Sequence, residues 1–323
     1  MSLFQSYIMV DWSGGSRRRG MRTDTIWIAY GGIGAEAPKS ISPFSRTEAI
    51  ELVAHLLEEN IRARRRTLVC FDFAYGYPVD FASALMAATG RSETALPWQE
   101  VWEYLDEVVR DDEGTTSHQR PSNRSNRFDV ANTINSLLSA TPEAAGPFWC
   151  RLDEGAYPYL PQNRPKQPFQ SAQGYLIKSL RLTDLRARSG TPFRLFGTAS
   201  VGSQSITGIP RLRALRNDPR FATLSAVWPF ETGWATRANW LPPRISIVHA
   251  EMYPGVRPPL EDTIKDRGQV RSMWHWARDL DRQDFLWFEF SRPIEIAPGA
   301  KEDIAIQLTE GWILGSSPTQ RPH

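Results

Sequence analysis

The sequence has very little cysteine, with only Cys70 and Cys150 among its 323 residues. Two cysteines in apolar surroundings are too few for the disulfide framework of a small secreted protein. No run of 18 apolar residues occurs, and no charged start is followed by an apolar stretch of the signal-peptide kind. We therefore expect a protein of the reducing cytoplasm that is not secreted and does not span a membrane.

Two common kinds of catalytic centre are also missing from the sequence. No cysteines and histidines have the spacing of zinc ligands, and no Gly-x-Ser-x-Gly turn is present to carry a serine nucleophile. Lysine is scarce as well: 5 of the 38 basic residues are lysine and 33 are arginine, and the net charge is only +2. Arginine suits phosphate and carboxylate partners. A GC-rich genome would produce the same bias, so the charge alone does not indicate nucleic acid.

What the sequence does contain is a set of short apolar runs, several of which end in an acid. Asp11 ends the first run and is followed by Trp12-Ser13-Gly14-Gly15, a glycine turn, and Asp72 ends another. A Ser-x-x-Glu capping box begins the helix between them. The expected order is strand, strand, strand, helix and strand: residues 7–11, 24–30, 37–41, a helix that begins at Ser45, and residues 67–71.

This order predicts an α/β fold in which Asp11 and Asp72 lie close together. A helical crossover makes the strand that ends at Asp72 parallel to the first one, so both acids lie at the carboxyl ends of their strands. Open α/β sheets bind their ligands at those ends.

The middle of the chain has a different character. Residues 79–190 contain helical patterns joined by polar or proline-rich stretches, which indicates a helical insertion or lobe carried on a core formed by residues 1–78 and 191–323. The expected helices cover residues 79–88, 98–109, 130–138 and 172–188.

A third acid-terminated run follows in the last part of the chain. Residues 245–251 end at Glu251, and a helix over residues 263–281 has Asp266 in its first turn. If Asp11, Asp72, Glu251 and Asp266 converged, their repulsion would be relieved by divalent cations, for which oxygen ligands suit Mg²⁺ or Mn²⁺. Asp11, Asp72 and Glu251 are the expected metal ligands. The alternative for Asp11 or Asp72 is to cap a turn, and for Glu251 simply to end a strand. Asp266 could instead complement the helix dipole.

Other segments could contact phosphate. Ser13 and Gly14 are candidate cofactor-binding residues, and residues 202–208 could present backbone N–H groups, although a surface turn explains them as well. Arg120, Arg124 and Arg127 suit a phosphate-contacting arm or a solvated loop.

Four segments resemble a bacterial family whose members are predicted to be RNase H-like nucleases: 10–14 (VDWSG), 71–78 (FDFAYGYP), 227–231 (VWPFE) and 251–254 (EMYP). Some longer relatives carry labels tied to molybdopterin-guanine dinucleotide or cobalamin biosynthesis. The resemblance covers most of the chain outside the helical middle. It implies an RNase H-like core, a mixed sheet flanked by helices, with Asp11, Asp72 and Glu251 as its acidic set.

Three functions remain open at this point. The first is a phosphodiesterase that uses Mg²⁺ or Mn²⁺ and acts on nucleic acid or a nucleotide-containing small molecule. The second is a non-catalytic accessory or binding protein on the same scaffold. The third is a nucleotide-binding phosphotransferase or ATPase, in which the turn after Asp11 would hold ATP phosphates.

Overall fold

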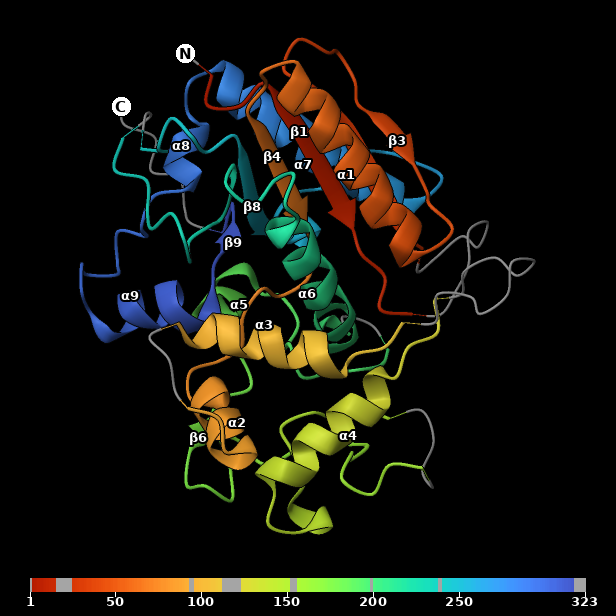
Figure 1. Ribbon diagram of the computed structural model, residues 1–323, viewed down its shortest axis with the longest axis vertical. Helices are drawn as coiled ribbons and strands as arrows, with labels where there is room; N and C mark the ends of the chain where they lie inside the picture. Colours follow the sequence, from red (N-terminus) through yellow and green to blue (C-terminus); the bar gives the residue numbers. More distant parts are fainter. Residues whose placement is uncertain are drawn as a thin grey trace.

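The protein has a mixed α/β fold whose sheet is mainly parallel (Figure 1). The computed structural model describes residues 2–15, 25–92, 96–111, 123–151, 156–197, 200–237 and 240–316. Within these residues the seven-stranded sheet has the order β3-β2-β1-β4-β8-β7, and β9 also pairs with β8. Its strands are β1 (Ser6–Asp11), β2 (Trp27–Gly32), β3 (Lys39–Ile41), β4 (Thr67–Phe71), β7 (Ser225–Val227), β8 (Ile247–Met252) and β9 (Ile313–Leu314).

The strand directions follow from the connections. Strands β3, β2 and β1 pair antiparallel, whereas β1, β4 and β8 run parallel, and β7 and β9 pair parallel with the start and end of β8. The longer helices are α1 (Arg46–Arg62), α3 (Pro97–Val108), α4 (Arg127–Leu138), α6 (Val201–Asn217) and α7 (Lys265–Arg282). The shorter ones are α2 (Phe81–Thr89), α5 (Leu182–Ala187), α8 (Leu286–Glu289), α9 (Lys301–Ala305), the 3₁₀ turns Pro142–Ala144 and Pro254–Val256, and the π-helical turn Ile306–Glu310.

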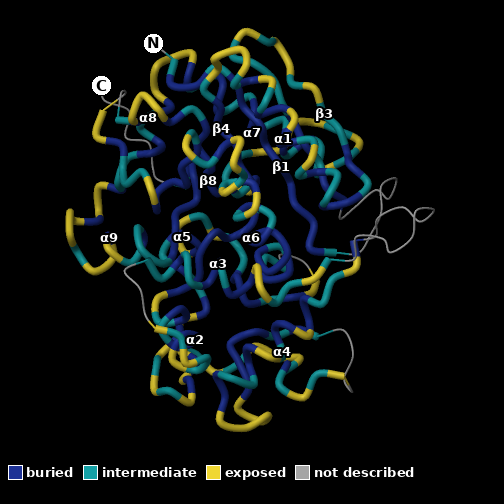
Figure 2. The backbone as a smooth tube through the Cα atoms, viewed as in Figure 1, coloured by how far each residue is buried: buried dark blue, intermediate teal, exposed yellow. Residues whose placement is uncertain are grey.

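The sheet separates two buried clusters, because side chains alternate between the faces of a strand. Ile8 and Val10 belong to the cluster that includes α1 and α6 residues, whereas Tyr7 and Met9 belong to the cluster that includes Trp274 of α7. Helices therefore cover both faces, and the central strands are dark throughout in Figure 2. We call these the α1 face and the α7 face.

The middle of the chain packs on the α1 face. Phe81, Trp102 and Ile134, from α2, α3 and α4, belong to the same buried cluster as Ile8. In Figure 1, α2 and α4 lie on the far side of α3 from the sheet. The division into a core and a helical lobe stays a prediction.

Most of the expected elements are confirmed, with small shifts at their ends. The helix after Ser45 is one: the Ser45 hydroxyl accepts a hydrogen bond from the Glu48 N–H, and the Glu48 carboxylate accepts one from the Phe44 N–H. Two expectations were wrong. Residues 172–188 are not one helix but contain part of the hairpin of β5 (Phe169–Gln170) and β6 (Leu176–Ile177), followed by α5. Residues 202–208 are not a loop but the first turns of α6.

Candidate acidic site at the carboxyl ends of the strands

The structure places Asp11 and Asp72 next to each other at one edge of the sheet. Val10 pairs with Phe71 in the parallel ladder, and the Asp72 N–H donates to the Val10 carbonyl at 3.2 Å, so the next step of the register sets Asp11 beside Asp72. The Trp12 N–H donates to Asp72 Oδ1 at 2.5 Å. Both acids continue the alternation of Met9 and Cys70 and therefore face α7.

Asp266, in the first turn of α7, acts electrostatically on Asp72. Burial raises the pKa of Asp72 to about 8, and the charge of Asp266 adds to the rise, whereas hydrogen bonds from the Trp12 N–H and the Gln204 amide oppose it. Gln204 Nε2 lies 3.5 Å from Asp72 Oδ2 and 2.5 Å from the Trp12 carbonyl oxygen. An electrostatic contact thus joins two of the predicted acids, Asp72 and Asp266, which are far apart in the sequence.

Glu251 is not brought to this group. It pairs with Phe71 in the ladder between β4 and β8, one step out of phase with Asp72. Its neighbours Ala250 and Met252 face α7, so Glu251 points to the α1 face. A shift of one residue moves a strand side chain to the opposite side of the sheet. Of the predicted acids, Asp11, Asp72 and Asp266 thus lie on the α7 face. Glu251 does not.

Glu251 is instead bound by a buried arginine that the sequence pattern did not reveal. Arg181 Nη2 and Nη1 donate to Glu251 Oε1 and Oε2 at 2.6 and 2.7 Å, and the same guanidinium donates to Asp184. Arg181 and Glu251 are 1% and 3% exposed. Burial raises the pKa of Glu251, and the Arg181 guanidinium opposes that rise. Arg181 and Asp184 have an i,i+3 spacing that is visible in the sequence, but nothing there connects them to β8.

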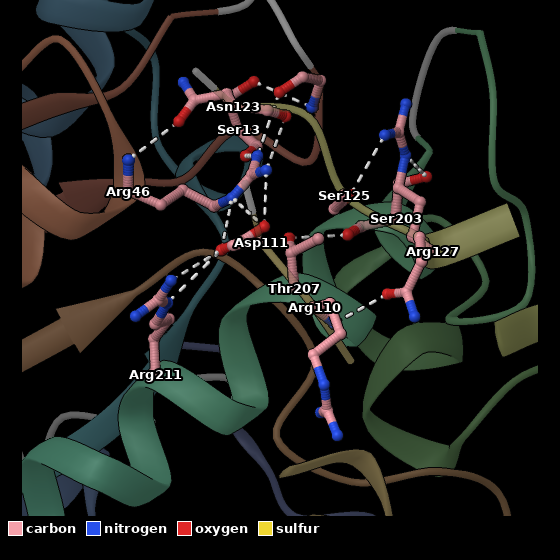
Figure 3. A network of polar contacts seen from close by, with 12 residues as sticks. Ser13, Arg46, Arg110, Asp111, Asn123, Ser125, Arg127, Ser203, Thr207 and Arg211 are labelled. Carbon is pink, nitrogen blue, oxygen red and sulfur yellow. Dashed lines mark hydrogen bonds and ion pairs between the residues drawn. The ribbon is translucent and has the colours of Figure 1, made fainter. Parts of the chain in front are cut away.

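The turn after Asp11 is held by a second arginine network (Figure 3). Arg46 Nη1 donates to the carbonyl oxygens of Ser13 and Gly15 at 3.0 and 2.9 Å, and the Arg46 guanidinium binds Asp111. Asp111 also binds Arg211 of α6, at 3.2 Å. This network fixes the turn to α1 and α6.

The two candidate cofactor-binding residues lie inside this packed turn. Ser13 is 2% exposed, and its hydroxyl accepts from the Gly15 N–H at 3.1 Å. A Cβ at Gly14 would lie 2.5 Å from the carbonyl carbon of Ser203 in α6. The close approach of the turn to α6 is a sufficient reason for glycine at this position.

The proposed arginine arm is only partly described. Arg120 lies outside the described residues, and Arg124 is exposed. Arg127 is buried, and its Nε donates to the Ser203 hydroxyl at 3.0 Å (Figure 3). Arg127 therefore anchors α4 to α6.

The acidic group has a donor set that suits Mg²⁺ or Mn²⁺ at Asp11, Asp72 and Asp266. All of its candidate ligands are carboxylate oxygens, and the repulsion between Asp72 and Asp266 is the kind that a cation removes. Among the described residues, no three Asp, Glu, His or Cys side chains are already grouped as a metal site. Mg²⁺ is commonly held by one or two carboxylates together with water and substrate phosphate, so these acids fit such an ion. Glu251 does not fit, because Arg181 binds both of its oxygens.

Comparisons of the chain with protein-family models, curated proteins and solved structures gave no significant match. The helices of the described residues include none with the length and apolar character that a membrane crossing requires. The function must therefore be argued from the geometry of the site.

Proposed function

We propose that this chain has an RNase H-like fold and is a divalent-cation-dependent phosphodiesterase, with nucleic acid or a nucleotide-containing small molecule as its substrate. The antiparallel β3-β2-β1 meander followed by parallel β4 and β8 supports the fold. The observation that carries the function is the acidic group on the α7 face, where Asp11 and Asp72 lie at the ends of adjacent parallel strands and the charge of Asp266 adds to the rise that burial causes in the pKa of Asp72.

The roles of the residues follow from this geometry. When bound, Mg²⁺ or Mn²⁺ would supply an activated water and stabilise the leaving oxygen of a phosphodiester. Asp11 and Asp72 would hold the ion, with Asp266 beside them. Asp72, with a pKa of about 8, would have to release its proton to become a ligand. Gln204 and the Trp12 N–H orient the Asp72 carboxylate.

The test is cleavage of a panel of single- and double-stranded DNA, RNA and dinucleotides with Mn²⁺ or Mg²⁺. We expect the unaltered chain to cleave and the Asp72→Asn variant to cleave at least about 100-fold more slowly. Substitution of residues that only support metal ligands already lowers metal affinity or activity about 10–100-fold, so loss of a ligand should cost at least as much. Glu302→Gln, at an exposed position in α9, is the matched control and should cleave normally. If the chain cleaved none of these substrates and bound neither ion, the proposal would be excluded.

A non-catalytic binding protein is the second candidate, and one observation favours it. Arg181 neutralises Glu251, and the raised pKa leaves Asp72 mostly protonated at neutral pH when no cation is present. If Asp11→Asn left the cellular role intact, this candidate would replace the phosphodiesterase. The structure does not favour the ATP-binding alternative, because Ser13 is buried and Gly14 packs against α6.

A further inference from the structure

The arginine that binds Glu251, Arg181, uses all of its side-chain donors in hydrogen bonds within the protein. Its five N–H groups all donate: Nε to Asp184, Nη1 to Glu251 and to the Glu310 carbonyl oxygen at 2.9 Å, and Nη2 to Asp184 and Glu251. No donor is left for a substrate. The planar fork of an arginine suits two carboxylates at once, which a point charge does not.

The position of the Arg181 guanidinium is fixed by its backbone as well as by its side chain. Arg181 is the residue that precedes α5, and its backbone N–H donates to Asp184 Oδ2 at 2.9 Å, so its main chain is fixed together with its side chain. Separating Arg181 from Glu251 would leave the buried Glu251 carboxylate without its opposite charge, which proteins avoid. An arginine also remains charged at every pH of interest.

The same cluster fixes the segment that follows Asp72. Glu251 Oε2 accepts from the Tyr75 N–H at 3.0 Å. Glu310 accepts from the Val79 N–H at 3.1 Å and from the Leu182 N–H at 2.8 Å. The segment from Tyr75 to Val79 is therefore bound at both ends by acids that contact Arg181 or the residue after it. Glu251 thus holds the Tyr75 backbone, three residues after Asp72, while both of its oxygens are bound by Arg181.

We propose that the Arg181 guanidinium takes the place that a second divalent ion would otherwise occupy at Glu251 on the α1 face, so that the chain binds one divalent ion, at the acidic group on the α7 face. This inference rests on the proposed function, because it takes Asp11, Asp72 and Asp266 as the acids that hold the single ion. It makes Arg181 and Glu251 positioning residues.

The experiment is a titration of the full chain with Mn²⁺, in which electron paramagnetic resonance measures free Mn²⁺. We expect one bound ion per chain. Glu251→Gln keeps an acceptor for the Tyr75 N–H and should retain one ion with an affinity within about twofold. Asp72→Asn should lose affinity by about 10–100-fold or more.

The variants separate this inference from the proposed function. Two ions in the unaltered chain, or a tenfold loss in Glu251→Gln, would overturn the inference and leave the phosphodiesterase proposal standing. The absence of any bound Mn²⁺ would overturn both.

Removal of the guanidinium gives the complementary test. If Arg181→Met folds, as judged by circular dichroism, it should gain a second, weaker Mn²⁺ ion, and the double variant with Glu251→Gln should return to one. A folded Arg181→Met that still binds one ion would contradict the role of Arg181 as a substitute cation. Arg216→Met, which breaks the ion pair with Glu231, is the control and should bind one ion.

Discussion

Glu289, in α8, is a buried carboxyl group whose ionisation should limit the stability of the protein. It is 1% exposed, and neither of its side-chain oxygens has a hydrogen-bond partner within the part of the chain that the structure describes. Burial raises its pKa from 4.5 to about 7, and only the charge of Arg257 opposes the rise. The perturbation is Glu289→Gln, which keeps the shape of the side chain and removes its ionisation.

The sign of the effect follows from the two pKa values. Below pH 4.5 the carboxyl group is protonated in both the folded and the unfolded chain, so it does not make stability depend on pH. Between pH 4.5 and about 7 the unfolded chain ionises more readily, and stability falls as the pH rises. Above pH 7 the loss reaches about 3 kcal/mol. With about 2.1 cal/mol/K of unfolding entropy per residue, this is about 4 °C in Tm.

The assay compares the Tm of the unaltered chain and Glu289→Gln at pH 4 and pH 8 by calorimetry. The Tm of Glu289→Gln minus that of the unaltered chain should be about 4 °C larger at pH 8 than at pH 4. Glu302→Gln, on the exposed surface of α9, should show no such gain. If the difference between Glu289→Gln and the unaltered chain were the same at both pH values, the argument from burial would be refuted.

Three further predictions concern the site and its surroundings. Gly76→Ala should lower the free energy of unfolding by about 1–3 kcal/mol or more in urea titrations, because the new Cβ would lie 2.1 Å from the Thr309 carbonyl oxygen; Gly34→Ala, which meets nothing within 4 Å, is its control. The affinity for Mn²⁺, measured by calorimetric titration, should rise with pH and level off above about 8, since Asp72 must lose a proton to bind; an affinity that does not change between pH 6 and 8 would contradict this. Burial raises the pKa of the Cys70 thiol, so it should resist alkylation, followed by mass spectrometry, until urea unfolds the chain.

The part of the fold that could be predicted from the sequence is the part that local patterns determine. The apolar runs that end at Asp11 and Asp72 are buried strands, and the Ser45 capping box begins α1. One short crossover then makes β4 parallel to β1, so the neighbourhood of the two acids follows from strand order alone.

The rest depends on contacts that no local pattern encodes. Glu251 ends an apolar strand just as Asp72 does, but the register of β8 against β4 is set by packing over the whole sheet, and it places Glu251 one step out of phase. Residues 202–208 contain two glycines and polar side chains, which are typical of a turn. They form a helix because Gly202 and Gly208 pack closely against the Arg194 backbone and the Phe73 ring.

The state of Asp72 shows why an acid can be found in a sequence while its chemistry cannot. Its oxygens accept from the Trp12 backbone after β1 and from Gln204 of α6, and its pKa is raised by burial and further by the charge of Asp266 of α7. Trp12, Gln204 and Asp266 lie far apart in the sequence and come close to Asp72 only in the folded chain. Helix α7 also supplies Trp274 to the core of that face, so one helix contributes both to the packing of the sheet and to the charge near Asp72. The pKa of Asp72 therefore depends on burial and on residues that follow β1 or belong to α6 and α7, which no local sequence pattern joins.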